Sequence, residues 1–240
     1  MIAAIMQPYF FPYIGYFQLM HAVDVFIFHD DVQYIKSGWI NRNRILVNDE
    51  PAWLTLPVEN ASYTSPIHHR HYQLDSKTIA RMKRRLEASY ARAPMFSRVF
   101  PFICDLLDYS ESNVAMYNSN LLMLVARAMG IRCDFLCSSK IDSLSALRAE
   151  DKVTALCASV GASTYVNPIG GLSLYSASAF AERGIDLQFL RSKPTSYTQF
   201  SAPHVPYLSI IDVLMFNSTD RLGDMLDLNE RLKPEAAQAS

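Results

Sequence analysis

The stretch IAAIMQPYFFPYIGYFQLMHAVDVFIF, residues 2–28, predicts the fold class of this chain. Residues 2–6 are a short apolar run typical of a buried strand, and residues 24–28 are a second one. Between them, residues 13–22 carry apolar side chains at helical spacing. A strand, a helix and a strand in this order predict a parallel sheet, with its first loop at the carboxyl end of a strand.

The same alternation returns in the second half of the chain. There we expect strands at 132–137, 163–167 and 186–190, helices at 148–160 and 174–182, and a final helix from about residue 209. The intervening segment predicts a hairpin at 40–47 and 52–58, a possible third strand at 67–75, and helices at 76–91, 95–107 and 112–129. The predicted fold is α/β, a Rossmann-like and mostly parallel sheet of about five strands in one domain of residues 1–240. The hairpin and the helices after it form a predicted insertion at 34–130.

Composition narrows the class of ligand and compartment. The net charge is −1, so no basic excess indicates nucleic acid or an anionic membrane, and a small molecule is the expected ligand. Four scattered cysteines without Cys-x-x-Cys spacing favour a reducing compartment, and we expect a cytoplasmic protein with neither an export leader nor a membrane span. No metal is predicted, because the histidines at 68, 69 and 71 lack a companion ligand nearby.

The first candidate site is the loop after residue 6. In sheets of this kind ligands bind beyond the carboxyl ends of the strands, where the strand order reverses. Gln7 has an amide that can both donate and accept, and two prolines stiffen the loop that follows. Four aromatic residues of this loop are candidates to face a base or a sugar ring, or alternatively to cap the core: Tyr9, Phe10, Phe11 and Tyr13.

The second candidate is HDDVQYIKSGWINRNR, residues 29–44. Adjacent carboxylates repel, so either Asp30 or Asp31 has a raised pKa and serves as a general base, or Lys36 and Arg42 steady both. The same cations, with the amide of Asn41, suit a phosphate or carboxylate group. Four further residues of this loop are candidates to bind substrate: His29, Gln33, Trp39 and Asn43.

Two later loops complete the predicted site. In NPIGGLSLY, residues 167–175, Gly170 and Gly171 allow positive φ and a close approach of the backbone to an anion at the start of a helix. Asn167 and Tyr175 flank them. In YTQF, residues 197–200, we expect Tyr197 and Gln199 to contact substrate. Ser209 and Asp212, just beyond, are explained as an N-cap and a first-turn carboxylate of the last helix.

Several blocks in order make the chain resemble the WbqC-like family of bacterial proteins. They are QPYFFPYIGYF, DDVQYIKSGWINRNRI, YARAPMF, YVNPIGGLSLY with FAERGIDLQFL, and YTQF with LSIIDVLMFN. The resemblance implies a role beside O-antigen and other surface-polysaccharide genes, in attaching glycine or another acyl group to a sugar. Residues 13–16, YIGY, also keep the glycine spacing of the HIGH motif of nucleotidyltransferases, but tyrosine replaces both histidines and cannot supply their positive charge to a phosphate.

The leading hypothesis is acyl or aminoacyl transfer to the amino group of a nucleotide-linked sugar. Asp30 or Asp31 would take the proton from the amine, while Lys36, Asn41 and Arg42 hold the donor or stabilise the oxyanion. The glycine loop and Tyr175 would hold the diphosphate. The cofactor is left open, with an acyl group on coenzyme A or on an acyl carrier protein as the donor to test first. The alternatives are a HIGH-like nucleotidyltransferase and a non-catalytic scaffold of a polysaccharide assembly complex.

Overall fold

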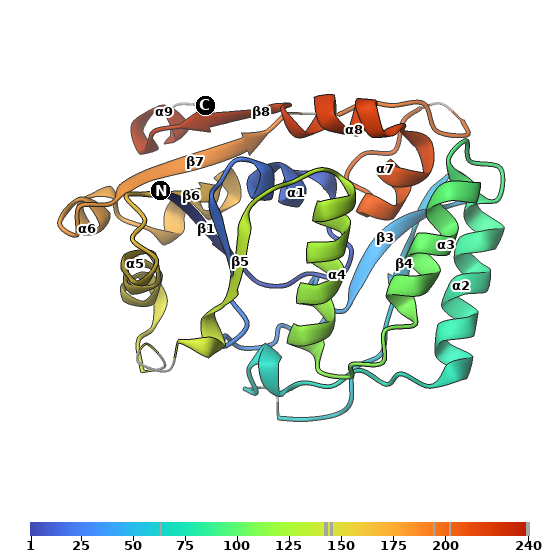
Figure 1. Cartoon of the computed structure of the whole chain (residues 1–240), viewed down its shortest axis with the longest axis horizontal. Helices are drawn as coiled ribbons and strands as arrows, with labels where there is room; N and C mark the ends of the chain where they lie inside the picture. The colour runs from blue at the N-terminus through green and yellow to red at the C-terminus, as the bar shows by residue number, and fades with distance from the viewer. Residues whose placement is uncertain (63, 142–143, 145, 194, 202, 239–240) are drawn as a thin grey trace.

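The computed structural model of the chain describes residues 1–62, 64–141, 144, 146–193, 195–201 and 203–238. Its main sheet has six strands: β1 (Ile2–Met6), β2 (Val25–Phe28), β5 (Asp134–Cys137), β6 (Thr164–Pro168), β7 (Asp186–Ser192) and β8 (Asn229–Leu232). The spatial order is β5-β2-β1-β6-β7-β8, and every neighbouring pair is parallel except β7 with β8 (Figure 1). The predicted α/β class and mostly parallel sheet are therefore confirmed, and the strand order reverses between β1 and β6 as in Rossmann-like sheets.

The central strands β1, β2 and β6 are mostly apolar because both faces of the sheet are covered there, whereas the edge strands β5 and β8 are more polar and more exposed. In β1 and β2, Ala3, Ile5, Val25 and Ile27 face one buried cluster and the residues between them face another. The first cluster also holds side chains of α5 (Ala149–Ser159), α6 (Ala177–Ala181) and α9 (Pro234–Gln238). The second and larger cluster holds side chains of α1 (Ile14–His21), α7 (Ile210–Phe216) and α8 (Thr219–Leu226).

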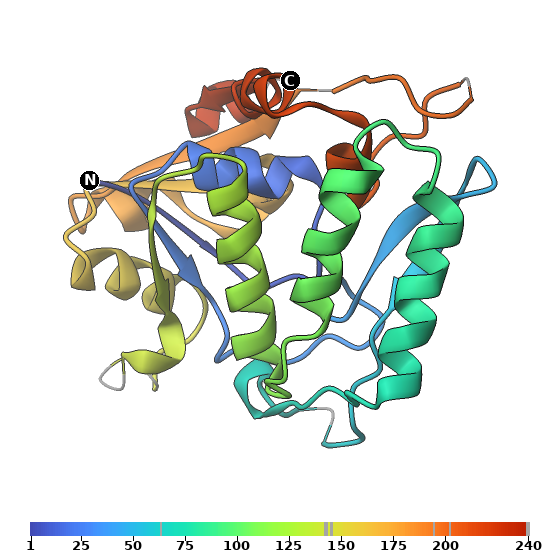
Figure 2. The ribbon, with the colours of Figure 1, turned by 45° about the vertical axis from the view of Figure 1, so that its right-hand side comes forward.

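The segment at 34–130 packs on the larger cluster. It consists of the hairpin β3 (Arg42–Val47) and β4 (Glu50–Thr55), the short 3-10 turn η1 (Ile67–His69), and the helices α2 (Ser76–Tyr90), α3 (Phe96–Leu107) and α4 (Val114–Ala128). Both ribbon views show these three helices standing side by side with the hairpin beside them (Figure 2). That this segment is an insertion stays a prediction, and its core is continuous with that of the sheet.

Four local predictions differ from the structure in their bounds or type. The hairpin turns at Asn48 and Asp49, which both have positive φ, so the strand resumes at Glu50. Residues 67–75 form η1 and isolated bridges in place of a third strand. The helix expected at 174–182 is present as the shorter α6, and the 3-10 segment η4 (Ile169–Leu174) precedes it. The last helix ends at Phe216, where Ser218 caps α8, and the polar strand β8 follows with no apolar run to signal it.

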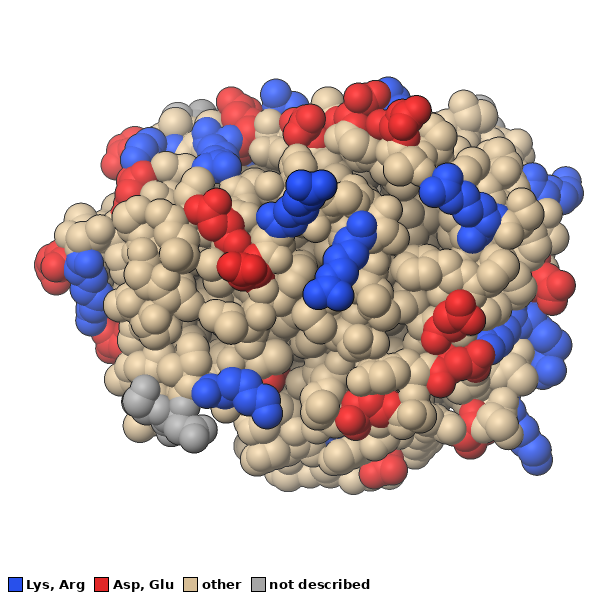
Figure 3. Space-filling model, in the orientation of Figure 1, with Lys and Arg blue, Asp and Glu red and all other residues tan. Residues whose placement is uncertain are grey.

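The surface fits the near-zero net charge. Lys, Arg, Asp and Glu of both signs are interspersed over the face shown in Figure 3. Among the described residues, no helix is both long enough and apolar enough to cross a bilayer.

Candidate functional site

A cavity of about 740 Å³ opens beyond the carboxyl ends of β1 and β6, where the strand order reverses. The ends of these two strands, the loops that follow them, the end of β2 and the start of the hairpin all contribute to its wall. This is the position where sheets of this type bind ligands, and its size suits a small molecule with several rings.

Gly15 makes room for one wall of the cavity. A Cβ at this position would overlap the ring of Tyr13, which lies over the first turn of α1 and lines the cavity. Tyr16, which stands where the HIGH motif has its last histidine, is buried, and its hydroxyl donates to the carbonyl of Gln7 at 2.7 Å. The glycine spacing in YIGY therefore has a steric reason, and the second tyrosine is part of the core.

Gly171 does the same for the opposite loop. A Cβ there would overlap the side-chain amide of Asn167, which is buried at the end of β6 and accepts a hydrogen bond from Tyr165 at 3.1 Å. Neither Gly170 nor Gly171 uses the positive φ that glycine allows, because the loop enters η4 directly and Gly171 has φ −99°. The absence of a side chain at Gly171 therefore leaves room for the amide of Asn167 in the cavity wall.

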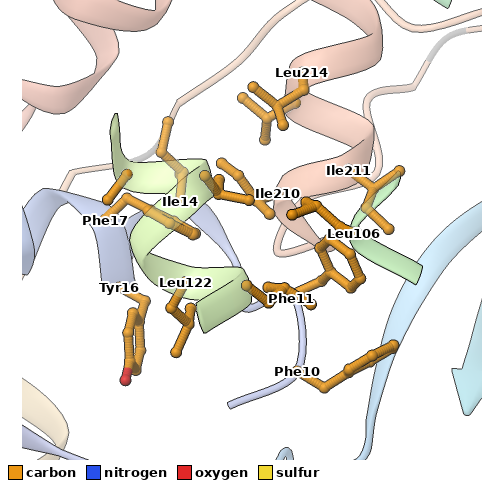
Figure 4. Packing of buried hydrophobic residues seen from close by; sticks show 14 of the residues in the cluster. Phe10, Phe11, Ile14, Tyr16, Phe17, Leu106, Leu122, Ile210, Ile211 and Leu214 are labelled. Carbon is orange, nitrogen blue, oxygen red and sulfur yellow. The ribbon is translucent and has the colours of Figure 1, made fainter. Parts of the chain in front are cut away.

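The aromatic loop after β1 divides between core and cavity. Tyr9 and Tyr13 line the cavity, whereas the rings of Phe10 and Phe11 are fully buried in the cluster that also holds Leu122 (Figure 4). For the two phenylalanines, the alternative that they cap the core is the correct one. Phe11 has φ 41°, a conformation rare for a bulky residue.

The strained loop is held by hydrogen bonds from distant segments. The carbonyl of Phe11 accepts from the Ser209 hydroxyl at 2.8 Å, and the carbonyl of Pro8 accepts from the Asn118 amide at 2.8 Å. Asn43 Nδ2 donates to Phe10 O at 3.3 Å. These contacts over-determine the backbone, which keeps the cavity wall rigid.

Arg44 is the cation of the cavity. It lines the wall beside Asn43, its guanidinium lies 5.9 Å from the centroid of the Trp39 ring, and one amino group donates to Tyr207 O at 3.4 Å. Its Nε is buried and has no hydrogen-bond partner among the described residues. Arg44 thus brings a guanidinium charge to the cavity wall, and its side chain would have to shift to offer Nε to an anionic ligand.

His29 is the titratable group in the cavity wall with the clearest shift. Burial, and to a lesser degree the Lys152 charge, lower its pKa to about 4 against the opposing effects of Asp31 and Asp30. Its Nε2 lies 3.7 Å from Asp31 Oδ1 and is buried without a hydrogen-bond partner among the described residues. The imidazole is therefore neutral at pH 7, and its contact with Asp31 is no ion pair there.

The predicted carboxylates point away from the cavity. Asp30 is buried and accepts from the backbone N–H of Ser139 at 2.9 Å, from its hydroxyl at 2.6 Å and from the Ser138 hydroxyl at 3.1 Å. These serines begin η2 (Ser138–Lys140), directly after β5. Asp30 thus ties the end of β2 to the end of β5.

Asp31 is paired with a buried lysine that the sequence analysis missed. Lys152, in α5, forms an ion pair with it, and the Ser138 hydroxyl donates to Asp31 Oδ1 at 2.6 Å. Burial favours a higher pKa for Asp31, but the hydrogen bonds and charge of Lys152 outweigh it, so the pKa is lowered. Lys36 and Arg42, expected to steady the pair, make none of these contacts.

The remaining predicted catalytic residues have other neighbours. Lys36 is exposed. Asn41 bridges Tyr34 and the carbonyl of Leu56, at 2.9 Å each. Arg42 donates to Gly38 O at 3.3 Å and stacks on Trp53 with its guanidinium carbon 4.1 Å from the ring centroid.

Tyr197 and Gln199 serve a buried carboxylate outside the cavity. Asp212 lies in the first turn of α7, whose N-cap is Ser209 as predicted. It accepts from Tyr197 at 2.6 Å, from Gln199 at 2.9 Å and from Tyr90 at 2.9 Å.

Ten of the thirteen residues predicted to bind substrate line the cavity, and none of the five predicted catalytic residues does. The ten are Gln7, Tyr9, Tyr13, His29, Trp39, Asn43, Asn167, Gly170, Gly171 and Tyr175. Gln33, Tyr197 and Gln199 lie outside its wall, as do Asp30, Asp31, Lys36, Asn41 and Arg42. Arg44 and Tyr207 are also in the wall but were not predicted to bind substrate. The sequence signals for them are weak: the alternation of polar residues in RNR for Arg44, and the preceding proline for Tyr207. Within the described ranges, no group of three His, Cys, Asp or Glu side chains is arranged to hold a metal ion.

Two comparisons with known proteins extend over most of the chain. The model of the WbqC-like protein family matches residues 7–223. The uncharacterized protein Rv1507c of Mycobacterium tuberculosis is 30% identical over 227 residues, which cover 93% of this chain and 96% of that protein. No solved structure matches the chain significantly.

Proposed function

We propose that this chain, which belongs to the WbqC-like protein family, transfers an acyl or aminoacyl group to the amino group of a nucleotide-linked sugar. The observation that carries the proposal is the chemistry of the cavity wall. Five aromatic rings, three side-chain amides and one guanidinium line it, and no carboxylate does among the described residues. A ligand that joins rings to an anionic group matches this wall, because rings stack on aromatics and a guanidinium binds phosphate oxygens.

The anionic part of the ligand is assigned to Arg44. Its guanidinium charge lies in the wall with the amides of Asn43 and Asn167, each of which donates one hydrogen bond within the protein, and without a competing carboxylate among the described residues. Tyr9 and Tyr13 then flank the sugar. This replaces Lys36 and Arg42 as the predicted anion-binding pair.

The proton acceptor in this scheme is His29, because it lines the cavity and stays neutral over the physiological range. The sugar nitrogen attacks the carbonyl of an acyl thioester, a C–N bond forms, and the C–S bond breaks. His29 accepts the proton that the nitrogen loses and returns it to the departing thiolate, which leaves as the thiol. Asp31 acts through His29, since its charge lies where it would stabilise the imidazolium during transfer. The roles first predicted for Asp30 and Asp31 as direct bases stay untested.

The proposal is tested by incubating the protein with a panel of amino-sugar nucleotides and acyl or aminoacyl thioesters and searching for the amide by mass. We expect one amide product, and we expect Arg44→Ala to weaken binding of the accepting nucleotide sugar about tenfold or more, the size of a charge-assisted hydrogen bond. Arg84→Ala, an exposed arginine of α2, is the matched control and should bind normally. Folded protein that forms no amide and binds no member of the panel would contradict the proposal, and pyrophosphate release from a nucleoside triphosphate would support nucleotidyl transfer in its place.

A further inference from the structure

The two tryptophans of the chain lie side by side on its surface. Trp39 is 40% exposed and Trp53 is 41% exposed, and their ring centroids are 5.5 Å apart. Trp39 precedes β3, and Trp53 is paired with Arg44 across the hairpin. Two large, half-exposed indoles in contact are an unusual use of surface, because each leaves apolar area in water that the core does not cover.

The pair is held in place by its surroundings. The carbonyl of Trp39 accepts from the backbone N–H of Phe10 at 3.0 Å, which anchors it to the rigid loop after β1. Arg42 covers Trp53 from one side and is itself fixed by the carbonyls of Ser37 and Gly38. A preorganised ring surface loses little conformational entropy when a second ring stacks on it.

The surface formed by Trp39 and Trp53 extends the wall of the cavity outward. Trp39 lines the cavity, and Trp53 lies next to Trp39 outside its wall. Arg44 lines the same cavity beside Trp39 and bears the unpartnered donor. The tyrosines, the guanidinium of Arg44 and the Trp39 ring therefore share one wall, and the Trp53 ring, inclined at 43° to that of Trp39, extends it, so that a ring stacked on one indole would meet the other at an angle.

We propose that Trp39 and Trp53 form the nucleobase subsite of this protein. The inference rests on the proposed function and adds the orientation of the ligand: the base stacks on the indoles, the diphosphate meets Arg44, and the amino sugar enters the cavity toward His29. Arg42 is a positioning residue that supports Trp53 from behind. Base–aromatic stacking contributes about 1–3 kcal/mol per base, which is roughly a five- to 150-fold effect on affinity.

The chain offers a direct optical test, because its only tryptophans are these two. Intrinsic tryptophan emission is measured while the protein is titrated with uridine, cytidine, adenosine, guanosine and thymidine diphosphates, and separately with glucosamine 1-phosphate. We expect at least one nucleoside diphosphate to quench the emission and glucosamine 1-phosphate to quench it much less. Calorimetry, which does not depend on tryptophan, then measures affinity in Trp39→Ala, Trp53→Ala and Arg42→Ala.

Each variant has its own expectation. Trp39→Ala should weaken the nucleoside diphosphate at least tenfold and leave glucosamine 1-phosphate within twofold of wild type, with smaller losses in Trp53→Ala and Arg42→Ala. Met116→Ala, which removes an exposed apolar side chain of α4, should change neither affinity. Because Trp39 is half-exposed, Trp39→Phe serves as a second variant that keeps a ring and should lose less.

The outcomes separate this inference from the proposed function. Equal losses of both probes in Trp39→Ala, or nucleotide binding without any dependence on the two indoles, would overturn the nucleobase subsite while acyl transfer could still be observed by mass. Absence of binding by every nucleotide and nucleotide sugar would overturn both.

Discussion

Two regions of the molecule each enclose an aspartate side chain, and they shift the pKa of its carboxyl group in opposite directions. At the ends of β2 and β5, Asp31 faces Lys152, whose side chain is only 3% exposed. In the first turn of α7, Asp212 is fully buried and is held by two tyrosines and a glutamine. The pKa of Asp31 is lowered although burial opposes this, because a lysine and a serine hydroxyl donate to it. The pKa of Asp212 is raised because burial outweighs its hydrogen bonds from neutral donors.

The difference shows that satisfying hydrogen bonds and compensating charge are separate tasks. Neutral donors complete the bonding of a carboxylate but leave it less stable as an anion than it is in water, whereas a buried cation restores the ionised form. The charge of Lys152 also lowers the pKa of His29, which opposes the effect of Asp31, whose charge favours the protonated imidazole. The region around Asp31, which contains the lysine, adjoins the cavity. The region around Asp212, in which no cation among the described residues is in contact with the carboxylate, connects the hairpin and α2 to α7.

The largest effect is expected from removing the cation. Lys152→Met leaves Asp31 buried without a counter-ion, and we expect the free energy of unfolding at pH 7 to fall by about 3–5 kcal/mol in urea titrations. The control is Lys83→Met, which breaks the more exposed pair with Asp108 and should cost about 1 kcal/mol or less. Equal losses of unfolding free energy in the two variants would show that the Lys152–Asp31 pair stabilises the fold no more than the exposed Lys83–Asp108 pair does.

A smaller loss is expected in the region around Asp212. Asp212→Ala leaves the donors of Tyr90, Tyr197 and Gln199 without their acceptor, and we expect about 2–4 kcal/mol less stability in the same titrations. Asp220→Ala, an exposed first-turn aspartate of α8, is the matched control and should lose about 0.3–1 kcal/mol. A loss at Asp212 no larger than this would mean that water replaces the carboxylate at no cost.

The smallest effect is a dependence on pH from His29. Its pKa is about 4 in the folded protein and 6.5 ordinarily, so between these values the unfolded chain binds a proton that the folded chain does not. Stability should therefore fall as the pH drops from 6.5 toward 4, by on the order of 2 kcal/mol at pH 4.5, and His29→Gln should abolish this component. Histidine NMR titration should also find a higher pKa for His29 in Lys152→Met than in wild type.

The control for this dependence is His21→Gln, which changes a more exposed histidine at the end of α1 and should keep the wild-type pH profile. A wild-type pH profile in His29→Gln would place the origin of the dependence elsewhere.

Five strands could be predicted from the sequence because the central strands, buried on both faces, are short apolar runs, and because β5 and β7 still carry apolar cores between their polar ends. The residues of the cavity wall could be predicted for a similar reason, since most of them directly follow a strand. The contacts of Asp31 could not, because Lys152 lies 121 residues away within an ordinary helical pattern. Arg42 and Arg44 were indistinguishable because they share one face of a strand, and the position of Trp53 across the hairpin decides which of them reaches the cavity.

The anchoring of the loop after β1 has a consequence for the order in which parts of the protein can fold. The carbonyl of Phe11 accepts from a hydroxyl 198 residues further along the chain, and Pro12 O accepts from the backbone N–H of Ile210. These contacts cannot hold the loop in its strained native shape until the segment around residues 209–210 has been synthesised and has packed against it. A chain truncated before residue 209 should therefore lack a formed cavity even where its five parallel strands have paired, so ligand binding would report that this distant segment is in place.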